Sequence, residues 1–377
     1  MTRIAFTADL HIDQYGSRID PATGLNARLV DFLRTTRFVA DTARLEGAEA
    51  LVVAGDFTER KHVNDWLLRH IQDALSDGPA RQVFLRGNHD AEIAGESKVS
   101  VLAQMGRQWT SSSGPSIEVV GDVVLCLMPY LDRHWLRAQP DMETVPDAEV
   151  FRLLAGTFLA VARGLYATAK ATHPDKATVL VCHQTLSGGR MGEAQQAFLG
   201  DLSLVVDTHA LAAIGFEAIV AGHLHRHQVI PASVPVLYCG SVERVDFGEE
   251  GEAKGFIVAD VAPGRFDWRF IETPARRFVT LTGDDWDVDL RGTVADAVVR
   301  VRDLPAEVDP SVVRYALEQA GAFEVHSIER VRVEAPEVAG GLAESLSPGQ
   351  ALEAWFEQDG DREALVARGR ELLEVAA

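Results

Sequence analysis

Residues 83–90 read VFLRGNHD, a short apolar run that leads directly into polar side chains. The first three residues favour a buried strand, and Asn88, His89 and Asp90 follow in the turn after it. Packing does not explain why three side chains that can bind a metal follow directly after an apolar strand. Because GNHD is only four residues long and chance matches to so short a motif occur, its meaning depends on the rest of the chain.

Four further segments share this pattern of a short apolar run followed at once by Asp, by His or by a glycine and a candidate ligand. They are Phe6–His11 (FTADLH), Val52–Asp56 (VVAGD), Val179–His183 (VLVCH) and Ile219–His225 (IVAGHLH). In open α/β sheets, functional groups gather at the carboxyl ends of the strands. We therefore expect seven side chains to converge on one point: Asp9, His11, Asp56, Asn88, His183, His223 and His225.

Two of these strand ends carry a more detailed expectation. Asp9 and His11 are two residues apart, which places both side chains on one side of an extended strand. Gly55 comes just before Asp56 and permits close backbone approach to whatever Asp56 binds.

The candidate ligands combine imidazole and carboxylate groups with one amide, a mixture that suits Mn²⁺, Fe²⁺ and Zn²⁺. No cysteine lies at a candidate position, which argues against a structural thiolate zinc site. Two divalent ions about 3.5–4 Å apart activate water and stabilise both the attacking and the leaving oxygen at a phosphoryl centre. His89 need not be a ligand, because an imidazole beside Asn88 can protonate the leaving oxygen or stabilise developing charge.

The remaining histidines need separate interpretations. A single buried histidine is about as often a hydrogen-bonded core residue as a ligand, whereas chance does not readily produce all five motifs in order. We interpret His227, just beyond His225, as a neighbour of the ligands. Surface or helix positions are predicted for the others: His62, His70, His134, His173, His209 and His326.

Composition excludes several classes of protein. The chain has 377 residues, of which 47% are apolar and 24% charged, as expected for a globular protein and not for a disordered or fibrous one. No uninterrupted apolar run approaches ~20 residues and the N-terminus has no secretory apolar region, so we expect no membrane span and a cytoplasmic location, which the family resemblance given below narrows to nucleoid-associated. The three cysteines lie in apolar runs and are predicted to be reduced core residues: Cys126, Cys182 and Cys239.

The formal charge of −20 is a poor electrostatic match for a protein that grips nucleic acid unaided. Bound dications would offset part of this charge. Any polyanionic substrate is therefore expected to be held locally, through metals and a few Arg or Lys side chains, or with help from a partner.

Hydrophobic periodicity predicts an alternation of strands and helices in the first part of the chain. Predicted helices cover Asn26–Gly47, Lys61–Asp77, Ser97–Gly106 and Pro146–Thr172. Strands are predicted at Arg3–Ala8, Ala50–Ala54, Val83–Leu85, Ile117–Val120, Val123–Met128, Val179–Cys182, Ala218–Ala221, Val236–Cys239, Gly255–Val261 and Phe266–Glu272. Ser111–Ser116 is predicted to be a turn-rich loop, and Ser187–Phe198 a flap over the site.

The pattern changes after Thr273–Arg277, which we interpret as the main boundary. Residues 278–335 predict a small β-β-α-β domain without metal-competent strand ends. Its elements are Phe278–Thr282, Ala297–Leu304, the helix Pro310–Ala320 and Val325–Glu334. The region 342–377 contains a helix–turn–helix-like tail at Ser347–Val375, too short to bury its own apolar face, with Trp355 and Phe356 interpreted as a partner surface in preference to an intrachain one.

Together and in this order, these motifs resemble the calcineurin-like metallophosphoesterase superfamily over residues 3–241. The resemblance implies an α/β (α+β) fold in which a sandwich of two β-sheets is flanked by helices. It implies that one metal takes Asp9, His11 and His225, and that the other takes Asn88, His183 and His223. It further implies that Asp56 bridges the two metals and that His89 is the general acid or charge stabiliser.

A narrower similarity lies in the segments YCGSVER (238–244), FGEE (247–250) and KGF (254–256), which resemble the SbcD family of DNA repair nucleases. This resemblance implies a nuclease domain at 1–273, a DNA-capping domain at 278–335 and a tail at 342–377 that docks on an SbcC-type ABC ATPase with a coiled coil. It also implies a homodimer formed through Lys61–Asp77 and Ser97–Gly106, DNA as substrate and two divalent ions. The expected metal is Mn²⁺, with Fe²⁺, Zn²⁺ or Mg²⁺ as alternatives.

Two other functions stay open from the sequence. One is a small-molecule or cyclic-nucleotide phosphodiesterase of the same superfamily, and the other is a non-catalytic scaffold, which the complete ligand set disfavours. The chain also departs from the family pattern at Glu59, where many relatives carry His or Asp. The acidic run Asp246–Glu252 would ordinarily be a solvated loop, although the family resemblance places it beside the site.

Overall fold

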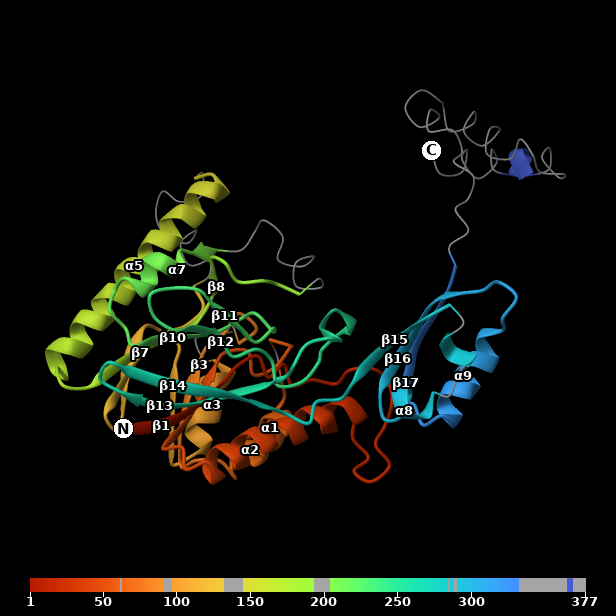
Figure 1. The fold of residues 1–377 in the computed structure, drawn as a ribbon, viewed down its shortest axis with the longest axis horizontal. Helices are drawn as coiled ribbons and strands as arrows, with labels where there is room; N and C mark the ends of the chain where they lie inside the picture. Colours follow the sequence, from red (N-terminus) through yellow and green to blue (C-terminus); the bar gives the residue numbers. More distant parts are fainter. Residues whose placement is uncertain are drawn as a thin grey trace.

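A computed structural model describes residues 1–61, 63–90, 97–131, 145–192, 204–283, 285–287, 290–331 and 365–368 (Figure 1). Most of the predicted C-terminal tail, with Trp355 and Phe356, lies outside the described residues. The same holds for part of the predicted flap and for His62 and His134.

Six strands form the first sheet, in the order β14-β13-β1-β2-β3-β4. Strands β1 to β4 run parallel, and β13 and β14 add an antiparallel hairpin beside β1. The bounds are β1 Thr2–Thr7, β2 Ala50–Ala54, β3 Arg81–Leu85, β4 Gln108–Ser112, β13 Gly255–Ala262 and β14 Arg265–Glu272. The loop predicted at Ser111–Ser116 is found at residues 113–115, whereas Ser111 and Ser112 belong to β4 and Ser116 begins the next strand. The polar side chains of β4 hide a strand that pairs with β3 through its backbone.

The second sheet has the order β11-β12-β10-β7-β6-β5, with a parallel centre and antiparallel strands at both edges. The bounds are β5 Ser116–Val120, β6 Val123–Met128, β7 Ala177–His183, β10 Ala218–Gly222, β11 Gln228–Ile230 and β12 Val236–Tyr238. Two short strands, β8 Thr185–Leu186 and β9 Val205–Val206, form a separate parallel pair.

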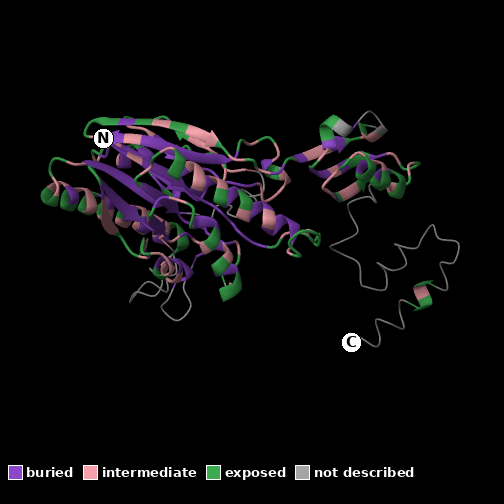
Figure 2. Cartoon of the chain, turned by 90° about the horizontal axis from the view of Figure 1, so that it is seen from below, coloured by how far each residue is buried: buried purple, intermediate pink, exposed green. Residues whose placement is uncertain are grey.

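The two sheets pack face to face, with helices on both outer sides (Figures 1 and 2). Alternate residues of β1 show why: Ile4 and Phe6 lie in the apolar layer between the sheets, whereas Ala5 faces the helices. Burial on both faces explains why these strands read as continuous apolar runs. The predicted sandwich flanked by helices is confirmed, and the three cysteines are free and buried within it.

Helices α1 Ala27–Leu45, α2 Asp65–Leu75 and α3 Lys98–Met105 cover the first sheet. Helices α5 Asp147–Thr172 and α7 Thr208–Ala212 cover the second. The helix α2 begins four residues later than predicted, because the side chain of Asn64 accepts the amide of Leu67 and caps it there.

By length and composition alone, α5 is long and apolar enough to cross a membrane, which the criterion of an uninterrupted run missed. It is the one such helix among the residues that the structure describes. In this fold its Leu154 and Phe158 are buried against the second sheet, whereas 22% of its apolar window is buried in total.

A three-stranded parallel sheet, β15-β16-β17, follows the sandwich and has its own apolar core. Its elements are β15 Phe278–Thr282, η3 Asp285–Asp287, α8 Arg291–Val294, β16 Val298–Leu304, α9 Pro310–Gln319 and β17 Glu324–Arg330. The predicted β-β-α-β order is found. The short elements η3 and α8 were not predicted, and they lie in the crossover that two adjacent parallel strands require.

Candidate metal centre

The loops that leave β1, β2 and β10 hold their polar residues in strained backbone conformations. Six non-glycine residues in the described part of the chain have positive φ, and four of them are predicted ligands: Asp9 (52°), His11 (42°), Asp56 (55°) and His223 (94°). Such conformations cost roughly 1–3 kcal/mol each and concentrate at functional sites. The strain therefore marks the same point as the sequence motifs.

Asp9 and His11 reach the centre by a route that the sequence did not predict. Strand β1 ends at Thr7, and the backbone of both residues is left-handed, so the alternating geometry of a strand does not align them. Instead, their loop runs along the loop after β2. The amide of Asp9 donates to Gly55 O (3.0 Å), and that of His11 donates to Asp56 O (3.1 Å).

The first half of the centre consists of Asp9, His11 and His225, whose potential ligand atoms lie within 4.8 Å of one another. All three side chains are largely or fully buried. Nδ1 of His11 donates to the carboxylate of Glu59 (2.7 Å), and Nδ1 of His225 donates to that of Glu249 (2.6 Å). Because these bonds engage Nδ1, the nitrogen that each ring can offer to a metal is Nε2.

The second half consists of Asn88, His183 and His223. The amide oxygen of Asn88 lies 3.0 Å from Nε2 of His183 and 2.9 Å from Nδ1 of His223. Nδ1 of His183 donates to Ala54 O (2.6 Å), which fixes its ring. Three potential ligand atoms from three different strand ends therefore face one another.

Asp56 lies between the two halves. Its Oδ2 is 3.2 Å from Nε2 of His183 and 3.7 Å from Nε2 of His11. The preceding Gly55 (φ +98°) makes this possible, because a Cβ there would come within 2.2 Å of the His183 ring. Gly55 thus allows the ring of His183 to lie close to the backbone of residue 55. The prediction was that this glycine would instead let the backbone approach the group that Asp56 binds.

The pKa shifts around Asp56 indicate that a nearby positive charge stabilises its buried carboxylate. Burial alone would lower the pKa of His183, but the adjacent Asp56 carboxylate outweighs it and raises the pKa to about 9. Burial and the neighbouring His183 lower the pKa of His223 to about 3. Burial would raise the pKa of Asp56, yet His183 holds it well below its usual value. A bound dication would supply this charge and keep the imidazoles neutral.

The residues fit a pair of divalent ions. Nε2 of His11 is buried and has no hydrogen-bond partner among the described residues, a costly state that a metal bond would relieve. Around it lie mixed imidazole, carboxylate and amide donors, the set that divalent transition metals accept. The fold and these clusters therefore indicate divalent metal ions.

His89 lies beside the centre, with one third of its side chain exposed. Its amide donates to Oδ1 of Asp56 (2.8 Å), and its Nδ1 lies 2.7 Å from the carbonyl oxygen of Glu59. The ring is thereby fixed in position, yet it is accessible to a substrate.

Asp90 has a supporting role at the centre that the sequence motifs did not predict. Its fully buried carboxylate accepts the amides of Asp56 (2.8 Å), Phe57 (3.1 Å) and Gly87 (2.9 Å), and so ties the turns after β2 and β3 together. The buried ammonium group of Lys98 lies 3.6 Å from it. The position of Asp90 within GNHD was the available signal.

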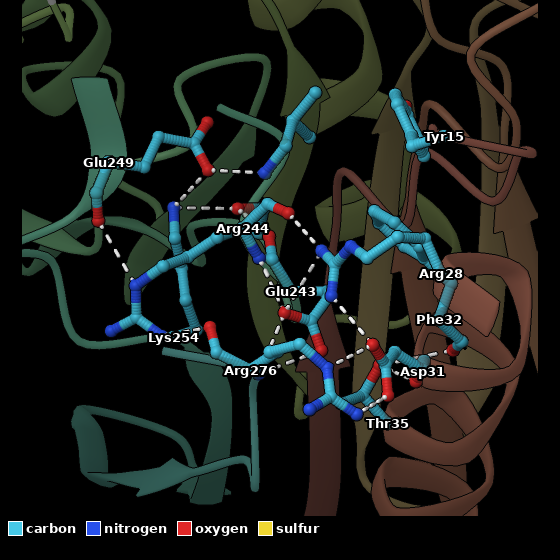
Figure 3. A network of polar contacts seen from close by, with 12 residues as sticks. Tyr15, Arg28, Asp31, Phe32, Thr35, Glu243, Arg244, Glu249, Lys254 and Arg276 are labelled. Carbon is cyan, nitrogen blue, oxygen red and sulfur yellow. Dashed lines mark hydrogen bonds and ion pairs between the residues drawn. The ribbon is translucent and has the colours of Figure 1, made fainter. Parts of the chain in front are cut away.

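Glu249 corrects the expectation that the acidic run 246–252 is simply solvated. It is buried, and besides His225 it accepts from Lys254 (2.9 Å) and from the amide of Val245 (2.9 Å). Its carbonyl oxygen accepts from Arg244 (3.2 Å). Figure 3 shows these contacts continuing into a larger polar network.

The described contacts of His227 are with residues that are not predicted ligands. Its ring stacks on Phe270 at 4.0 Å, and its Nδ1 lies 2.8 Å from the carbonyl oxygen of Tyr238. These contacts hold the ring of His227 against β12 and β14.

A family model and several known proteins are similar to this chain. The family model described as calcineurin-like phosphoesterase matches residues 2–227, more than half of the chain. The SbcD component of the SbcCD nuclease from Escherichia coli (strain K12) is 24% identical over 282 residues, a match that covers 70% of this chain and 66% of that protein. The match therefore spans just under two thirds of that relative's length.

Among solved structures, a dimetal phosphatase from Danio rerio has a TM-score of 0.47 at 10% identity, covering 72% of this chain and 97% of the other. The phosphopantetheinyl hydrolase of Mycobacterium tuberculosis has a TM-score of 0.37 at 14% identity, covering 64% and 90%. The extent of the family match, together with the sandwich fold, shows that this chain belongs to the calcineurin-like phosphoesterase family and is a metal-dependent phosphoesterase.

Proposed function

We propose that this chain is the nuclease subunit of an SbcCD-type complex that processes double-strand breaks in DNA. The observation that carries the proposal is the position of the segment FGEE, which narrows the resemblance to SbcD proteins. In this fold it is not a remote surface loop, because its Glu249 bonds directly to His225 (2.6 Å) at the centre. The similarity to a component of an E. coli nuclease supports the same function.

In this proposal Asp9, His11 and His225 hold one metal and Asn88, His183 and His223 hold the other, with Asp56 shared. The expected metal is Mn²⁺, with Fe²⁺, Zn²⁺ or Mg²⁺ as alternatives. Two such ions would activate water and stabilise charge on the phosphodiester.

His89 supplies a proton to the leaving oxygen or stabilises the charge that develops on it. Its ring suits this role, since Nδ1 is held by the carbonyl of Glu59 and one third of the side chain is exposed. The strained loops keep the donor atoms in place before substrate arrives, so no reorganisation is needed during the reaction.

The wider assembly is part of the same proposal. Residues 1–273 would form the nuclease domain, 278–335 a DNA-capping domain and 342–377 the segment that docks on an SbcC-type ATPase, with two copies forming a homodimer. A net charge of −20 fits this arrangement, because DNA would then be gripped mainly by the partner and the metals.

The test is digestion of linear double-stranded DNA in Mn²⁺ by the wild type and by Asp56→Asn, with bis-p-nitrophenyl phosphate hydrolysed in parallel. We expect the wild type to degrade DNA and the rate of degradation to fall by at least about 10³-fold in Asp56→Asn. The reason is that losing the shared carboxylate removes several kcal/mol of charge stabilisation. DNA degradation that persists in Asp56→Asn would exclude this centre as its source.

A small phosphodiesterase of the same family is the second candidate, favoured by the acidic net charge. It predicts rapid hydrolysis of the dye ester while DNA stays intact, both alone and after addition of an SbcC-type ATPase. DNA cleavage that appears only with the ATPase supports the nuclease function.

A further inference from the structure

We infer that Lys98 is a positioning residue for the reaction, because it fixes the loop after β2 and, through the backbone of that loop, the ring of His89. This inference rests on the proposed role of His89 as the group that protonates the leaving oxygen or stabilises its charge. It goes beyond that role by giving a function to a buried lysine that no step of the proposed mechanism uses.

Lys98 is the first residue of α3, and its side chain is 5% exposed. Its ammonium group donates to the hydroxyl of Thr58 and to the carbonyl oxygen of Arg60 (2.7 Å), and the carboxylate of Asp90 lies 3.6 Å away. A buried ammonium group is stable only where such partners replace the water that it loses. The lysine therefore ties the start of α3 to the loop after β2.

The two loop residues that Lys98 holds lie on either side of Glu59. The carbonyl oxygen of Glu59 accepts from Nδ1 of His89 at 2.7 Å. Because each peptide unit is a rigid plane, fixing Thr58 and Arg60 restricts the direction in which the carbonyl between them points. Lys98 therefore acts on His89 through one backbone carbonyl.

The same loop also contacts a proposed metal ligand, but through a more adaptable group. The carboxylate of Glu59 accepts from Nδ1 of His11, and 37% of the Glu59 side chain is exposed. A carboxylate at the end of such a side chain can follow a small shift of the backbone by changing its rotamer, whereas a backbone carbonyl cannot. The amide of His11 is held independently by Asp56 O (3.1 Å). A shift of the loop should therefore displace His89 more than it disturbs the ligands.

Two substitutions release the loop to different degrees. Lys98→Met keeps an unbranched side chain and removes its N–H donors, so it should lower kcat by about 10–100-fold, since a misplacement of about 1 Å can cost on the order of 10²-fold. Thr58→Val removes one acceptor and leaves Lys98 beside Asp90, so it should disturb folding less and lower kcat by only about 3–10-fold, the equivalent of one hydrogen bond.

The experiment is hydrolysis of bis-p-nitrophenyl phosphate at saturating Mn²⁺, with each variant made alone and in combination with His89→Asn. Alone, each should lower kcat as stated and change KM and bound Mn²⁺ by less than about twofold, because the proposed ligands stay in place. Combined with His89→Asn, each should lower kcat by less than about twofold further, because the group through which it acts is already gone.

The matched control is Lys254→Met. Lys254 is a second buried lysine beside the centre, with a side chain that is 0% exposed, and it pairs with Glu249 (2.9 Å) and so supports His225 in place of His89. Its loss of activity should be the same within about twofold with and without His89→Asn, as for two independent sites.

A second readout needs neither metal nor turnover. Nitrogen NMR of the histidine rings in the metal-free protein, at a pH where imidazole is neutral, reports which nitrogen of His89 carries the proton, and His89→Asn assigns the signal. The bond to the Glu59 carbonyl predicts a proton on Nδ1 in the wild type. Lys98→Met and Thr58→Val should shift the signal toward a mixture of both tautomers, because that bond is weakened.

A loss of kcat that is equal with and without His89→Asn, or a His89 tautomer that neither variant changes, overturns the inference. If Lys98→Met does not fold, Thr58→Val decides it by the same two criteria. The readouts do not involve DNA. A chain that shows the expected coupling on the dye ester but leaves DNA intact, alone and with an SbcC-type ATPase, would therefore contradict the proposed nuclease function and not this inference.

Discussion

Within the described residues, two buried clusters of charged side chains can be compared, and they balance their charges in different ways. One is the metal centre. The other is the network that joins the sandwich to the small sheet β15–β17 (Figure 3). Both are assembled from distant parts of the sequence, and both bury carboxylates, so burial of charge alone does not separate a functional site from a structural one.

The junction network supplies its own cations. Asp31 on α1 pairs with Arg28 (2.8 Å) and accepts from Nη2 of Arg276 (2.7 Å). Arg276 in turn donates to Asp296 beyond β15 (3.0 Å) and lies over the Phe323 ring at 3.5 Å. Each of these charges therefore has a protein partner of opposite sign.

The metal centre does not balance its charges in this way. In the part of the chain that the structure describes, no Arg or Lys lies within ion-pair distance of Asp9 or Asp56. Asp56 instead raises the pKa of the neighbouring His183, and Nε2 of His11 stays without a hydrogen bond. The comparison teaches that a buried acidic cluster without its own Arg or Lys points to a bound cation.

The largest expected effect on stability lies at the junction. Arg276→Met should lower the free energy of unfolding by about 3 kcal/mol, because breaking a buried ion pair costs roughly 3–5 kcal/mol and Asp31 keeps Arg28 as a partner. Chemical denaturation measures this. The matched control is Asp296→Asn, which removes the partner that is 86% exposed and should cost less than about 1 kcal/mol. Equal losses for the two variants would contradict a buried network.

At the metal centre, His89→Asn should lower kcat by about 10²–10³-fold, the usual loss when one group that stabilises transition-state charge is removed. Bound metal should be unchanged, because His89 is not a proposed ligand. Turnover of the dye ester and metal content by atomic absorption measure the two quantities. Unchanged turnover would remove His89 from the mechanism, and loss of metal would make it a ligand.

Removing metal should separate the two clusters directly. Free Mn²⁺ at a hundred times its Kd should stabilise the folded chain by about 2.7 kcal/mol per site, because it binds the folded state alone. Thermal unfolding with Mn²⁺ or with EDTA measures this. The gain should vanish in Asp56→Asn and persist in Arg276→Met. A gain that persists in Asp56→Asn would place the ion elsewhere.

The strand ends could be predicted from sequence because their signal is local. An apolar run that stops at Gly-Asp or Gly-Asn-His shows both a buried strand and a polar turn, and the sandwich brings these ends together. The same local logic failed at β4, whose polar sequence QWTSS gives no strand pattern although its backbone pairs with β3.

The supporting residues could not be predicted, because their partners are distant in the sequence. Asp31 and Arg276 are 245 positions apart, and His11 and Glu59 are 48 apart. Glu249 lies in an acidic run whose composition indicates solvent exposure, and only the folded chain shows that one of these acids is buried on His225. Contacts between residues so far apart in the chain produce no periodic pattern in the sequence.

The prediction with the smallest expected effect asks whether the two clusters are independent. Adjacent glutamates contact them, one at the metal centre and one at the small sheet. Glu249 faces His225, whereas Glu250 accepts from the amide of Thr280 on β15 (2.8 Å) and from its hydroxyl. Glu250→Gln keeps one acceptor oxygen, so it should lower the free energy of unfolding by only about 1 kcal/mol.

Affinity for Mn²⁺ should stay within about twofold in Glu250→Gln. Glu249→Gln should lower it by about 10–100-fold, because it removes the carboxylate that Nδ1 of the proposed ligand His225 bonds to. If Glu250→Gln weakened Mn²⁺ binding about tenfold, the small sheet and the metal centre would form one coupled unit. The junction network, whose charges pair with one another, would then not be independent of the metal centre, whose charges need a bound cation.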